Sequence, residues 1–282
     1  MTSARDLGPD ALVWDHFSRP REDDVVARIH AAANAGYAGI GLYVGAWEAL
    51  RTNPAAVEAV DDALAATGVV IANIEVARGW ASPDHADERC QRTEALAHEM
   101  ADRWGCRYLQ VIGDYTGTLA EAAVGFGALC DRAGEHGLLV GLEWVPQMTN
   151  IENAATAMRI VLGADRSNGG VCFDSWHLTR STNDLDDLRA IPGEKILATQ
   201  WNDGTVIAQN PDYYTDCLSN RVPPGQGEFQ LVDMVQILDR IGSRAPLGLE
   251  VCSSTLWAGP VGQAAQVSAD GMRSVLAEAR RS

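Results

Sequence analysis

Hydrophobic and polar residues alternate in blocks along the whole chain. Short runs rich in apolar and β-branched residues are followed by longer segments in which apolar residues recur every three or four positions, as on one face of a helix. The strand-like runs are ALVWDHF (11–17), GIGLYVG (39–45), VVIANIEV (69–76), RYLQVIGDY (107–115), LLVGLEWVP (138–146), GGVCFDSW (169–176), ILATQWNDG (196–204) and PLGLEVCSS (246–254). The pattern therefore predicts eight strands separated by helices.

The helical segments end in a consistent way. Residues 23–36, 54–68 and 229–242 are examples with helical spacing of apolar residues. Several helical segments stop at a glycine, which adopts the left-handed conformation common just after a helix. These glycines are Gly36, Gly68, Gly105, Gly137 and Gly242. Because a new strand-like run begins within a few residues of each glycine, the chain consists of compact βα units.

Strict alternation of strand and helix predicts a parallel sheet, and eight units favour its closure into a barrel. The 282 residues allow about 35 residues for each unit. An open doubly wound sheet is the alternative, but it usually has fewer strands, and no GxGxxG follows the first strand-like run. We therefore predict a single (β/α)8 TIM barrel domain over residues 1–282. The long connection at 204–227 is the least regular part, and loops of this length are often functional.

Composition and charge narrow the classes of partner. Hydrophobic residues make up 46% of the chain and charged residues 21%, which favours a large core over disorder. The formal net charge of -16 disfavours nucleic acids and anionic membranes as partners. We found neither a long apolar segment nor a signal-like N-terminus, and the six cysteines lack zinc-binding spacing. We expect a cytoplasmic protein with a small-molecule substrate.

The last four strand-like runs end in polar residues that share one register. The residues are Glu143, Asp174 followed by His177, Gln200, and Glu250. Two positions earlier, on the same face of each strand, stands a small residue: Gly141, Cys172, Ala198 and Gly248. Since the carboxyl ends of barrel strands meet at one face, we expect the four polar side chains to point inward there, over a layer of small residues that leaves them room.

Carboxylates that lie close together in a buried site need compensating charge, because burial and mutual repulsion disfavour their ionised forms. A divalent cation would supply it. Glu143, Asp174, Gln200 and Glu250 offer only oxygen ligands, which suit Mn²⁺ or Mg²⁺, with Co²⁺ as a further option. Taken singly, each residue has an ordinary explanation, since a strand-end acid is often a helix N-cap or an ion-pair partner. The metal hypothesis depends on their coincidence in one register.

At these residues the chain resembles the sugar phosphate isomerase/epimerase family, whose members have a xylose isomerase-like TIM barrel. The similarity extends over nearly the whole chain and depends on Glu143, Asp174 with His177, and Glu250. It implies that Glu143 and Glu250 serve as acid and base as well as metal ligands. It also implies that His177 orients or protonates a substrate oxygen.

A second stretch, RVPPGQGEF at 221–229, is similar to a segment of the family in which an arginine contacts substrate oxygens. This makes Arg221 a candidate substrate-binding residue, with a surface arginine on a mobile loop as the alternative. Gln200 departs from many epimerases of the family, which have His there, and resembles the bacterial 3-dehydroshikimate dehydratases. The departure keeps a metal site but weakens the transfer of epimerase activity, and an amide oxygen favours harder ions.

Tryptophans gather near the predicted strand ends. They are Trp14, Trp47, Trp80, Trp144, Trp176, Trp201 and Trp257. If they line the barrel mouth, they suit a ring-shaped or partly apolar substrate, and we take Trp144, Trp176 and Asn202 as candidate substrate contacts. The alternative is packing between strands and helices, which must hold for some, because Trp144, Trp176 and Trp201 directly follow inward-facing residues. His16 is a further candidate acid or base.

The candidate site suits removal of a proton next to a carbonyl group, through a metal-stabilised enediolate. Return of the proton gives an isomerase or epimerase of a sugar or cyclic polyol or ketone, our first hypothesis. Loss of a hydroxyl gives a dehydratase, a lyase of a 3-dehydroshikimate-like or inosose-like ring. An endonuclease-type hydrolase would need more histidines and a basic groove, and a non-catalytic binding subunit would have lost site residues. The family resemblance also implies a homodimer or homotetramer.

Overall fold

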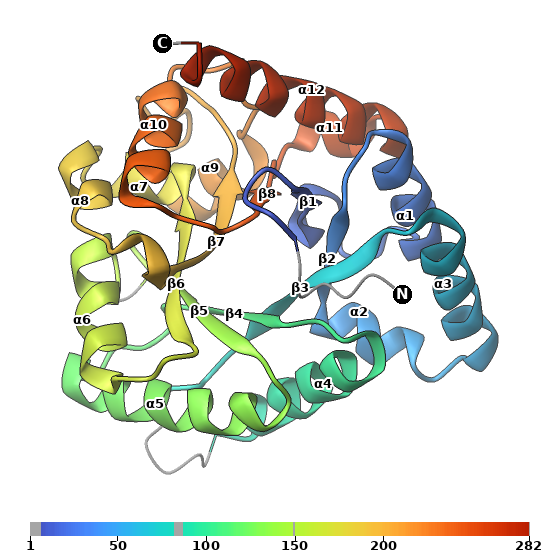
Figure 1. Ribbon diagram of the computed structural model, residues 1–282, viewed down its shortest axis with the longest axis horizontal. Helices are drawn as coiled ribbons and strands as arrows, with labels where there is room; N and C mark the ends of the chain where they lie inside the picture. The colour runs from blue at the N-terminus through green and yellow to red at the C-terminus, as the bar shows by residue number, and fades with distance from the viewer. Residues whose placement is uncertain (1–6, 82–86, 149, 282) are drawn as a thin grey trace.

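The computed structural model describes residues 7–81, 87–148 and 150–281. Its centre is a closed barrel of parallel strands that pair in chain order, with the last strand returning to the first (Figure 1). The strands are β1 (Leu12–Trp14), β2 (Gly39–Tyr43), β3 (Val70–Ala77), β4 (Tyr108–Ile112), β5 (Leu139–Glu143), β6 (Gly169–Asp174), β7 (Ile196–Trp201) and β8 (Leu247–Leu249). Each coincides with one predicted run, so the (β/α)8 barrel is confirmed.

Helices surround the barrel on all sides in Figure 1. They are α1 (Val25–Asn34), α2 (Val44–Leu50), α3 (Pro54–Thr67), α4 (Glu88–Trp104), α5 (Leu119–Glu135), α6 (Ala154–Ala164), α7 (Ser175–Ser181), α8 (Leu185–Arg189), α9 (Tyr213–Ser219), α10 (Leu231–Ile241), α11 (Ser254–Ala258) and α12 (Val261–Ala279), with short 3-10 turns η2 (His16–Ser18) and η3 (Gly193–Lys195). Local signals set their bounds. In α3, the Asn53 side chain caps the start and Gly68 ends the helix at a φ of 74°.

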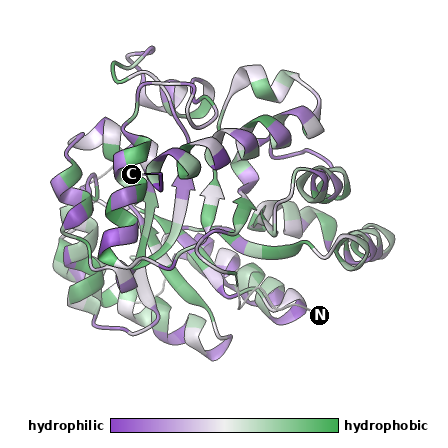
Figure 2. Cartoon of the chain, turned by 45° about the horizontal axis from the view of Figure 1, so that its top comes forward, coloured by the Kyte–Doolittle hydropathy of each residue, from purple (hydrophilic) through white to green (hydrophobic). Residues whose placement is uncertain are grey.

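Most of the hydrophobic core lies between the strands and the surrounding helices. In Figure 2, hydrophobic residues (green) predominate on the strands, whereas the helices contain both hydrophobic and hydrophilic (purple) residues. This is the pattern of amphipathic helices that cover a barrel buried on both faces. Within the described residues, no helix is both long and apolar enough to cross a membrane.

A small apolar plug fills the barrel beneath the carboxyl ends of the strands. It consists of Tyr108, Cys172 and Ala198. A Cβ atom added at Gly141 would overlap the Tyr108 hydroxyl, and one added at Gly248 would overlap the backbone oxygen of Thr199 and lie 2.6 Å from Asp15 Oδ2. At Gly141, therefore, the absence of a side chain makes room for Tyr108, and at Gly248 it makes room for the neighbouring strand and Asp15. For these two glycines this corrects the expectation that the small residues leave room for the candidate ligands themselves.

We expect Gly141→Ala to lower the free energy of unfolding by about 1–3 kcal/mol, because the added methyl group overpacks the plug. Tyr108→Phe in the same chain should recover part of the loss by removing the overlapping oxygen. Gly262→Ala in α12 is the matched control, since a Cβ there meets no atom within 4 Å. Chemical denaturation measures all three. Equal stability of the Gly141→Ala and Gly262→Ala variants would contradict this packing.

Candidate active site

Acidic side chains meet at the carboxyl ends of the strands. Glu143 ends β5, Asp174 ends β6, and Glu250 directly follows β8; all are buried, with at most 6% of the residue exposed. His177 of α7 lies beside two of them, with Nε2 at 3.0 Å from Glu143 Oε1 and 3.5 Å from Asp174 Oδ2. Ligand atoms of Glu143, Asp174 and His177 all lie within 4.8 Å of one another. These three residues could therefore hold one metal ion.

A buried arginine joins Asp174 to Glu250. Nη1 of Arg221 lies 2.9 Å from Asp174 Oδ2 and 2.9 Å from Glu250 Oε2. Two further contacts hold the guanidinium in place: Nε donates to the Cys217 carbonyl, and the group lies 5.4 Å from the centre of the Trp176 ring. Only 1% of Arg221 is exposed, so the alternative of a surface arginine is wrong. Two carboxylates thus share one positively charged nitrogen.

The long connection after β7 is ordered by a buried carboxylate. The backbone of Asp203 pairs with that of Val222, and its side chain accepts the amides of Gly204, Gly225 and Phe229. The connection also contains α9, whose Tyr213 hydroxyl lies 2.6 Å from Nδ1 of His177. One loop therefore supplies Arg221 to the carboxylates and a hydrogen-bond partner to His177.

Asp174 has both an ordinary role and a place in the site. Its Oδ1 accepts the Trp176 amide at 2.7 Å, which caps α7, and the Asn202 side-chain amide at 2.8 Å. Its Oδ2 faces Arg221 and His177. The helix-capping explanation is therefore correct for one oxygen, while the other belongs to the group of candidate ligands. Asn202 acts on the site by positioning Asp174, and its contact with a substrate stays a prediction.

A glutamine that the sequence analysis did not single out connects Gln200 to the acids. Gln110 of β4 donates from Nε2 to Glu143 Oε2 at 2.7 Å and to Gln200 Oε1 at 3.2 Å. Nε2 of Gln200 and Oε1 of Gln110 are buried without a hydrogen-bond partner among the described residues. The signal was present, because Gln110 is a polar residue inside the otherwise apolar run YLQVI.

The electrostatics of this group favour a bound cation. Burial raises the pKa of Glu250 well above its usual value, nearby Glu143 and Asp174 raise it further, and Arg221 opposes the shift. Three carboxylates face one guanidinium and one imidazole, so negative charge remains in excess. Buried carboxylates in excess, with an amide oxygen beside them, form a donor set that fits a divalent cation.

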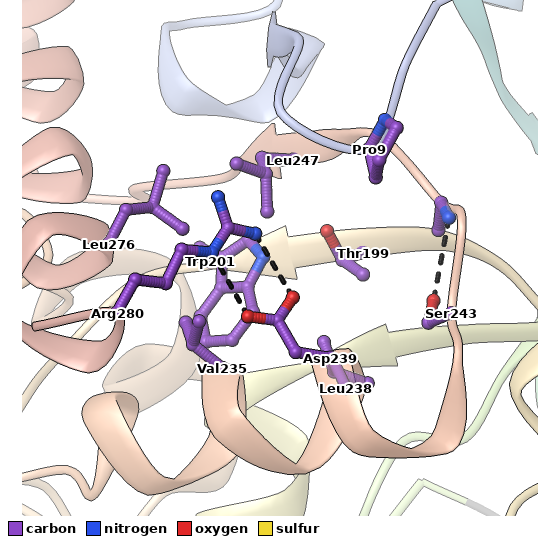
Figure 3. Close-up of a pocket in the computed structure, with 11 residues that line it drawn as sticks. Pro9, Thr199, Trp201, Val235, Leu238, Asp239, Ser243, Leu247, Leu276 and Arg280 are labelled. Atoms are coloured by element: carbon purple, nitrogen blue, oxygen red, sulfur yellow. Dashed lines mark hydrogen bonds and ion pairs between the residues drawn. The ribbon is translucent and has the colours of Figure 1, made fainter. Parts of the chain in front are cut away.

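Three of the tryptophans near the strand ends, Trp144, Trp176 and Trp201, pack against other side chains. Trp144 and Trp201 both pack against Phe173, with ring centres 6.5 and 5.5 Å apart. Figure 3 places Trp201 beside side chains of α10 and α12, outside the barrel. Trp176 is fully buried under the guanidinium of Arg180, at 4.1 Å. These contacts agree with the alternative that the indoles pack between strands and helices: Trp144 follows an inward-facing strand residue and points outward, and Trp176 of α7 packs against Arg180 and Arg221. Contact of Trp144 or Trp176 with a substrate stays a prediction.

A second group of buried acids was missed. Asp15 directly follows β1, Glu75 lies in β3, and neither has any exposed surface. Asn73 donates to Asp15 Oδ1, and the backbone amide of His16 donates to Glu75 Oε1. The strand-end comparison covered only the last four strands. Polar residues at alternate positions of VVIANIEV were the available signal for an inward-facing polar group.

Known proteins similar to this chain share its barrel. A family model described as xylose isomerase-like TIM barrel matches residues 29–276. The 3-dehydroshikimate dehydratase of Pseudomonas aeruginosa is 31% identical over 189 residues, which are 67% of this chain and 29% of that protein. The inosose isomerase of Bacillus licheniformis is 30% identical over 127 residues, which are 44% of this chain and 43% of the isomerase. The chain thus matches less than half the length of either relative.

Solved structures have the same architecture at lower identity. The IolI protein with a bound zinc atom superposes with a TM-score of 0.80 at 17% identity, over 95% of this chain and 98% of that one. D-allulose 3-epimerase from Methylomonas sp. superposes with a TM-score of 0.70 at 17% identity, over 95% and 98% of the two chains. At this identity the likeness shows the fold alone.

Proposed function

The chain belongs to the xylose isomerase-like TIM barrel family, and from this premise we propose that it is a divalent-metal-dependent enzyme that removes a proton next to the carbonyl group of a sugar or cyclic polyhydroxy ketone. The observation that carries the proposal is the buried group of Glu143, Asp174 and Glu250, in contact with His177 and Arg221. Such a group combines a cation site with carboxylates that can take and return protons.

Glu143 and Asp174 would hold the cation, because they belong both to the ligand set expected from the sequence and to the compact group within 4.8 Å. Glu250 and the amide oxygen of Gln200 complete the expected set, and His177 is the third member of the compact group. A divalent cation bound there would polarise the carbonyl oxygen of the substrate. The predominance of oxygen donors favours Mn²⁺ or Mg²⁺.

The protein groups around the acids have distinct tasks. Arg221 holds Asp174 and Glu250 in place through one nitrogen. His177 carries its ring proton on Nε2, because the carboxylate of Glu143 beside it can only accept, and Nδ1 then accepts from the Tyr213 hydroxyl. In this structure that N–H therefore donates to Glu143, and the donation to a substrate oxygen that the resemblance implies would require it to leave Glu143. Burial of the whole group would keep water away from the substrate after it has lost the proton next to its carbonyl.

Return of the proton to carbon gives the first outcome, an isomerase or epimerase. Glu143 and Glu250 come from β5 and from the end of β8 and would act as the acid and base on either side of the substrate carbon. Similarity to an inosose isomerase over 127 residues supports this outcome.

Loss of a hydroxyl next to the carbanion gives the second outcome, a dehydratase. Gln200 favours it, because the resemblance associates glutamine at this position with dehydratases. Similarity to a 3-dehydroshikimate dehydratase over 189 residues also supports it. Both outcomes begin with the same removal of a proton, so the acids at the mouth serve either.

Incubation with 3-dehydroshikimate, inososes and a panel of ketoses in D₂O with Mn²⁺ tests the proposal. We expect at least one compound to take up deuterium at the carbon next to its carbonyl, and the chelator-treated protein to be inactive. Mass spectrometry separates the outcomes once incorporated deuterium is subtracted. The product of isomerisation or epimerisation then has the mass of the substrate, whereas the product of dehydration is lighter by 18 mass units, the mass of one water. Absence of exchange across the whole panel would contradict the proposal and favour a non-catalytic binding protein.

A further inference from the structure

Two carboxyl groups remain that the proposed metal site does not use. Asp15 follows β1 and Glu75 lies in β3, on the side of the eight-stranded ring away from β5 and β6. Asp15 Oδ1 accepts from Asn73 at 2.6 Å, and Glu75 Oε1 accepts from the His16 amide at 3.1 Å. The other oxygens, Asp15 Oδ2 and Glu75 Oε2, have no donor among the described residues. Each acid therefore has one satisfied oxygen and one free oxygen.

The two carboxyl groups are close enough to share a proton. Glu75 Oε1 accepts the backbone amide of His16, the residue directly after Asp15, which brings the two side chains together; a hydrogen bond from the Asp15 side chain also lowers the pKa of Glu75. The nearest guanidinium, that of Arg28, is engaged by His16 Nδ1 at 2.6 Å and the Asp15 carbonyl at 3.3 Å. No ion pair joins Arg28 to either carboxylate in the described chain. Two adjacent buried carboxyl groups without a direct cationic partner cannot both ionise at low cost, so the pair retains one proton.

The surroundings of Glu75 support this protonation. Burial raises the pKa of Glu75 to about 7, the nearby charge of Glu143 adds to the shift, and the His16 amide, the charge of Arg28 and a hydrogen bond from Asp15 oppose it. Burial and the charges of Glu75 and Glu250 hold the pKa of Asp15 well above its usual value, so the shared proton lies on Asp15. The titratable and charged groups that face Glu75 from neighbouring elements are Asp15, His16, Arg28, Cys106, Glu143 and Glu250.

His16 adds a neutral donor on the same side of the barrel. Arg28 can only donate, so Nδ1 of His16 is the acceptor in their 2.6 Å contact, and the ring proton lies on Nε2. That atom is buried and has no partner in the described chain. Burial and the charge of Arg28 keep the pKa of His16 well below its usual value, so the ring stays neutral.

The acid pair faces the same interior as the candidate metal ligands. Asn73 pairs in register with Tyr108 and Ile74 with Leu109; the register then shifts by one residue before Ala77 pairs with Val111, so Glu75 and Val76 both lie opposite Gln110. Gln110 in turn donates to Glu143 and to Gln200. Glu75 is therefore one inward-facing neighbour away from the residues that would bind the cation.

We propose that Asp15 and Glu75 share one proton and that this pair is the acid that protonates a departing substrate hydroxyl, which makes the enzyme a dehydratase. The inference rests on the proposed function, which supplies the removal of the first proton. Isomerisation needs one proton to leave and return, for which Glu143 and Glu250 suffice. A third acid is needed when the leaving group is hydroxide, because hydroxide leaves poorly unless it is protonated.

Elimination of water moves one proton from carbon to the base and one from the acid pair to the leaving oxygen. A carboxylate of the metal site takes the hydrogen next to the carbonyl as a proton, and the electron pair of that C–H bond forms the new carbon–carbon double bond. The C–O bond at the next carbon breaks, and its electron pair stays on oxygen. That oxygen takes the proton of the Asp15–Glu75 pair and leaves as water. Exchange with solvent returns a proton to the pair and removes one from the base.

Glu75→Gln tests the pair, with 3-dehydroshikimate and inososes as probes in D₂O with Mn²⁺. Glutamine keeps the size of the side chain and can still accept the His16 amide, but it cannot supply the proton. We expect elimination of water to fall by about 10²–10⁴-fold, while deuterium exchange next to the carbonyl falls far less. Asp15→Asn, which keeps the Asn73 hydrogen bond, is the second variant and should separate the two rates in the same direction.

The pH profile gives a readout that a structural role would not change. Elimination by the wild type should continue as pH rises past about 7, where Glu75 ionises, because burial and the charge of Glu75 hold the pKa of Asp15 well above its usual value and keep one proton on the pair. In Asp15→Asn only Glu75 can supply a proton, so the residual elimination should instead fall as Glu75 ionises. Glu94→Gln is the control, since Glu94 is equally buried but pairs with Arg132 among the outer helices. It should keep the wild-type ratio of exchange to elimination.

Three results would overturn the inference. One is a Glu75→Gln variant that eliminates water at the wild-type rate, and another is an equal loss of exchange and elimination in both variants. The third is a wild type that exchanges deuterium but never eliminates water, which would leave the proposed function standing as an isomerase. A wild type without exchange would instead remove the proposed function and this inference together.

Discussion

Glu143→Gln should reduce turnover by about 10³-fold or more, the scale expected when a catalytic acid or base is removed. Glu143 contacts His177 through one oxygen and Gln110 through the other. Glutamine preserves the shape of this arrangement but removes one of the charges that would attract a divalent cation. Loss of a ligand charge should also weaken metal binding strongly.

Calorimetric titration with Mn²⁺ and the D₂O exchange rate measure the two effects. Glu99→Gln is the charge-matched control, because Glu99 forms an exposed ion pair with Arg51 on the outer helices. It should leave both quantities unchanged. If Glu143→Gln bound Mn²⁺ as tightly as the wild type, Glu143 would not be a ligand.

Arg221→Met should destabilise the metal-free protein by about 3–5 kcal/mol, the cost typical of breaking a buried ion pair from one side. Nη1 of Arg221 is the shared partner of Asp174 and Glu250, and both carboxylates are buried. Methionine fills much of the same volume without charge. The two acids would then repel each other with only the more distant His177 to compensate.

Divalent cations should rescue this variant, and the rescue separates a metal site from a purely structural ion pair. We expect Mn²⁺ to raise the melting temperature of Arg221→Met more than that of the wild type, because a bound ion replaces the missing positive charge. Arg280→Met is the control; Arg280 pairs with Asp239 and Asp10 at the surface, so its loss should cost about 1 kcal/mol or less. A variant that Mn²⁺ leaves unstable would indicate that Arg221 serves the fold alone.

The barrel was predictable because its strands are buried on both faces and read as continuous apolar runs. Glycines marked the helix ends, and Gly36, Gly68 and Gly242 adopt the positive φ expected of them. Strand bounds were less accessible. β1 and β8 are only three residues each, although the next residues, Asp15 and Glu250, still donate backbone hydrogen bonds to the neighbouring strands.

The candidate ligands were predictable because side chains alternate between the two faces of a strand. Glu143 and Asp174 share the inward face with the small residue two positions earlier, and the structure brings them together. The same alternation gave the packing alternative for Trp144, whose indole lies against Phe173. Arg221 could be proposed only by resemblance, because it lies on the irregular loop that Asp203 orders, where no strand periodicity predicts the direction of a side chain. Asp15 and Glu75 gave a signal that one comparison of all eight strands would have detected.

Anomalous X-ray scattering from crystals grown with Mn²⁺ tests the central claim most directly. The claim is that the strand-end acids hold one divalent cation inside the barrel mouth. It requires a single strong peak bounded by the carboxylate oxygens of Glu143 and Asp174, absent from crystals of Glu143→Gln. A wild-type crystal with no peak among these acids, at Mn²⁺ concentrations that support activity, would contradict it.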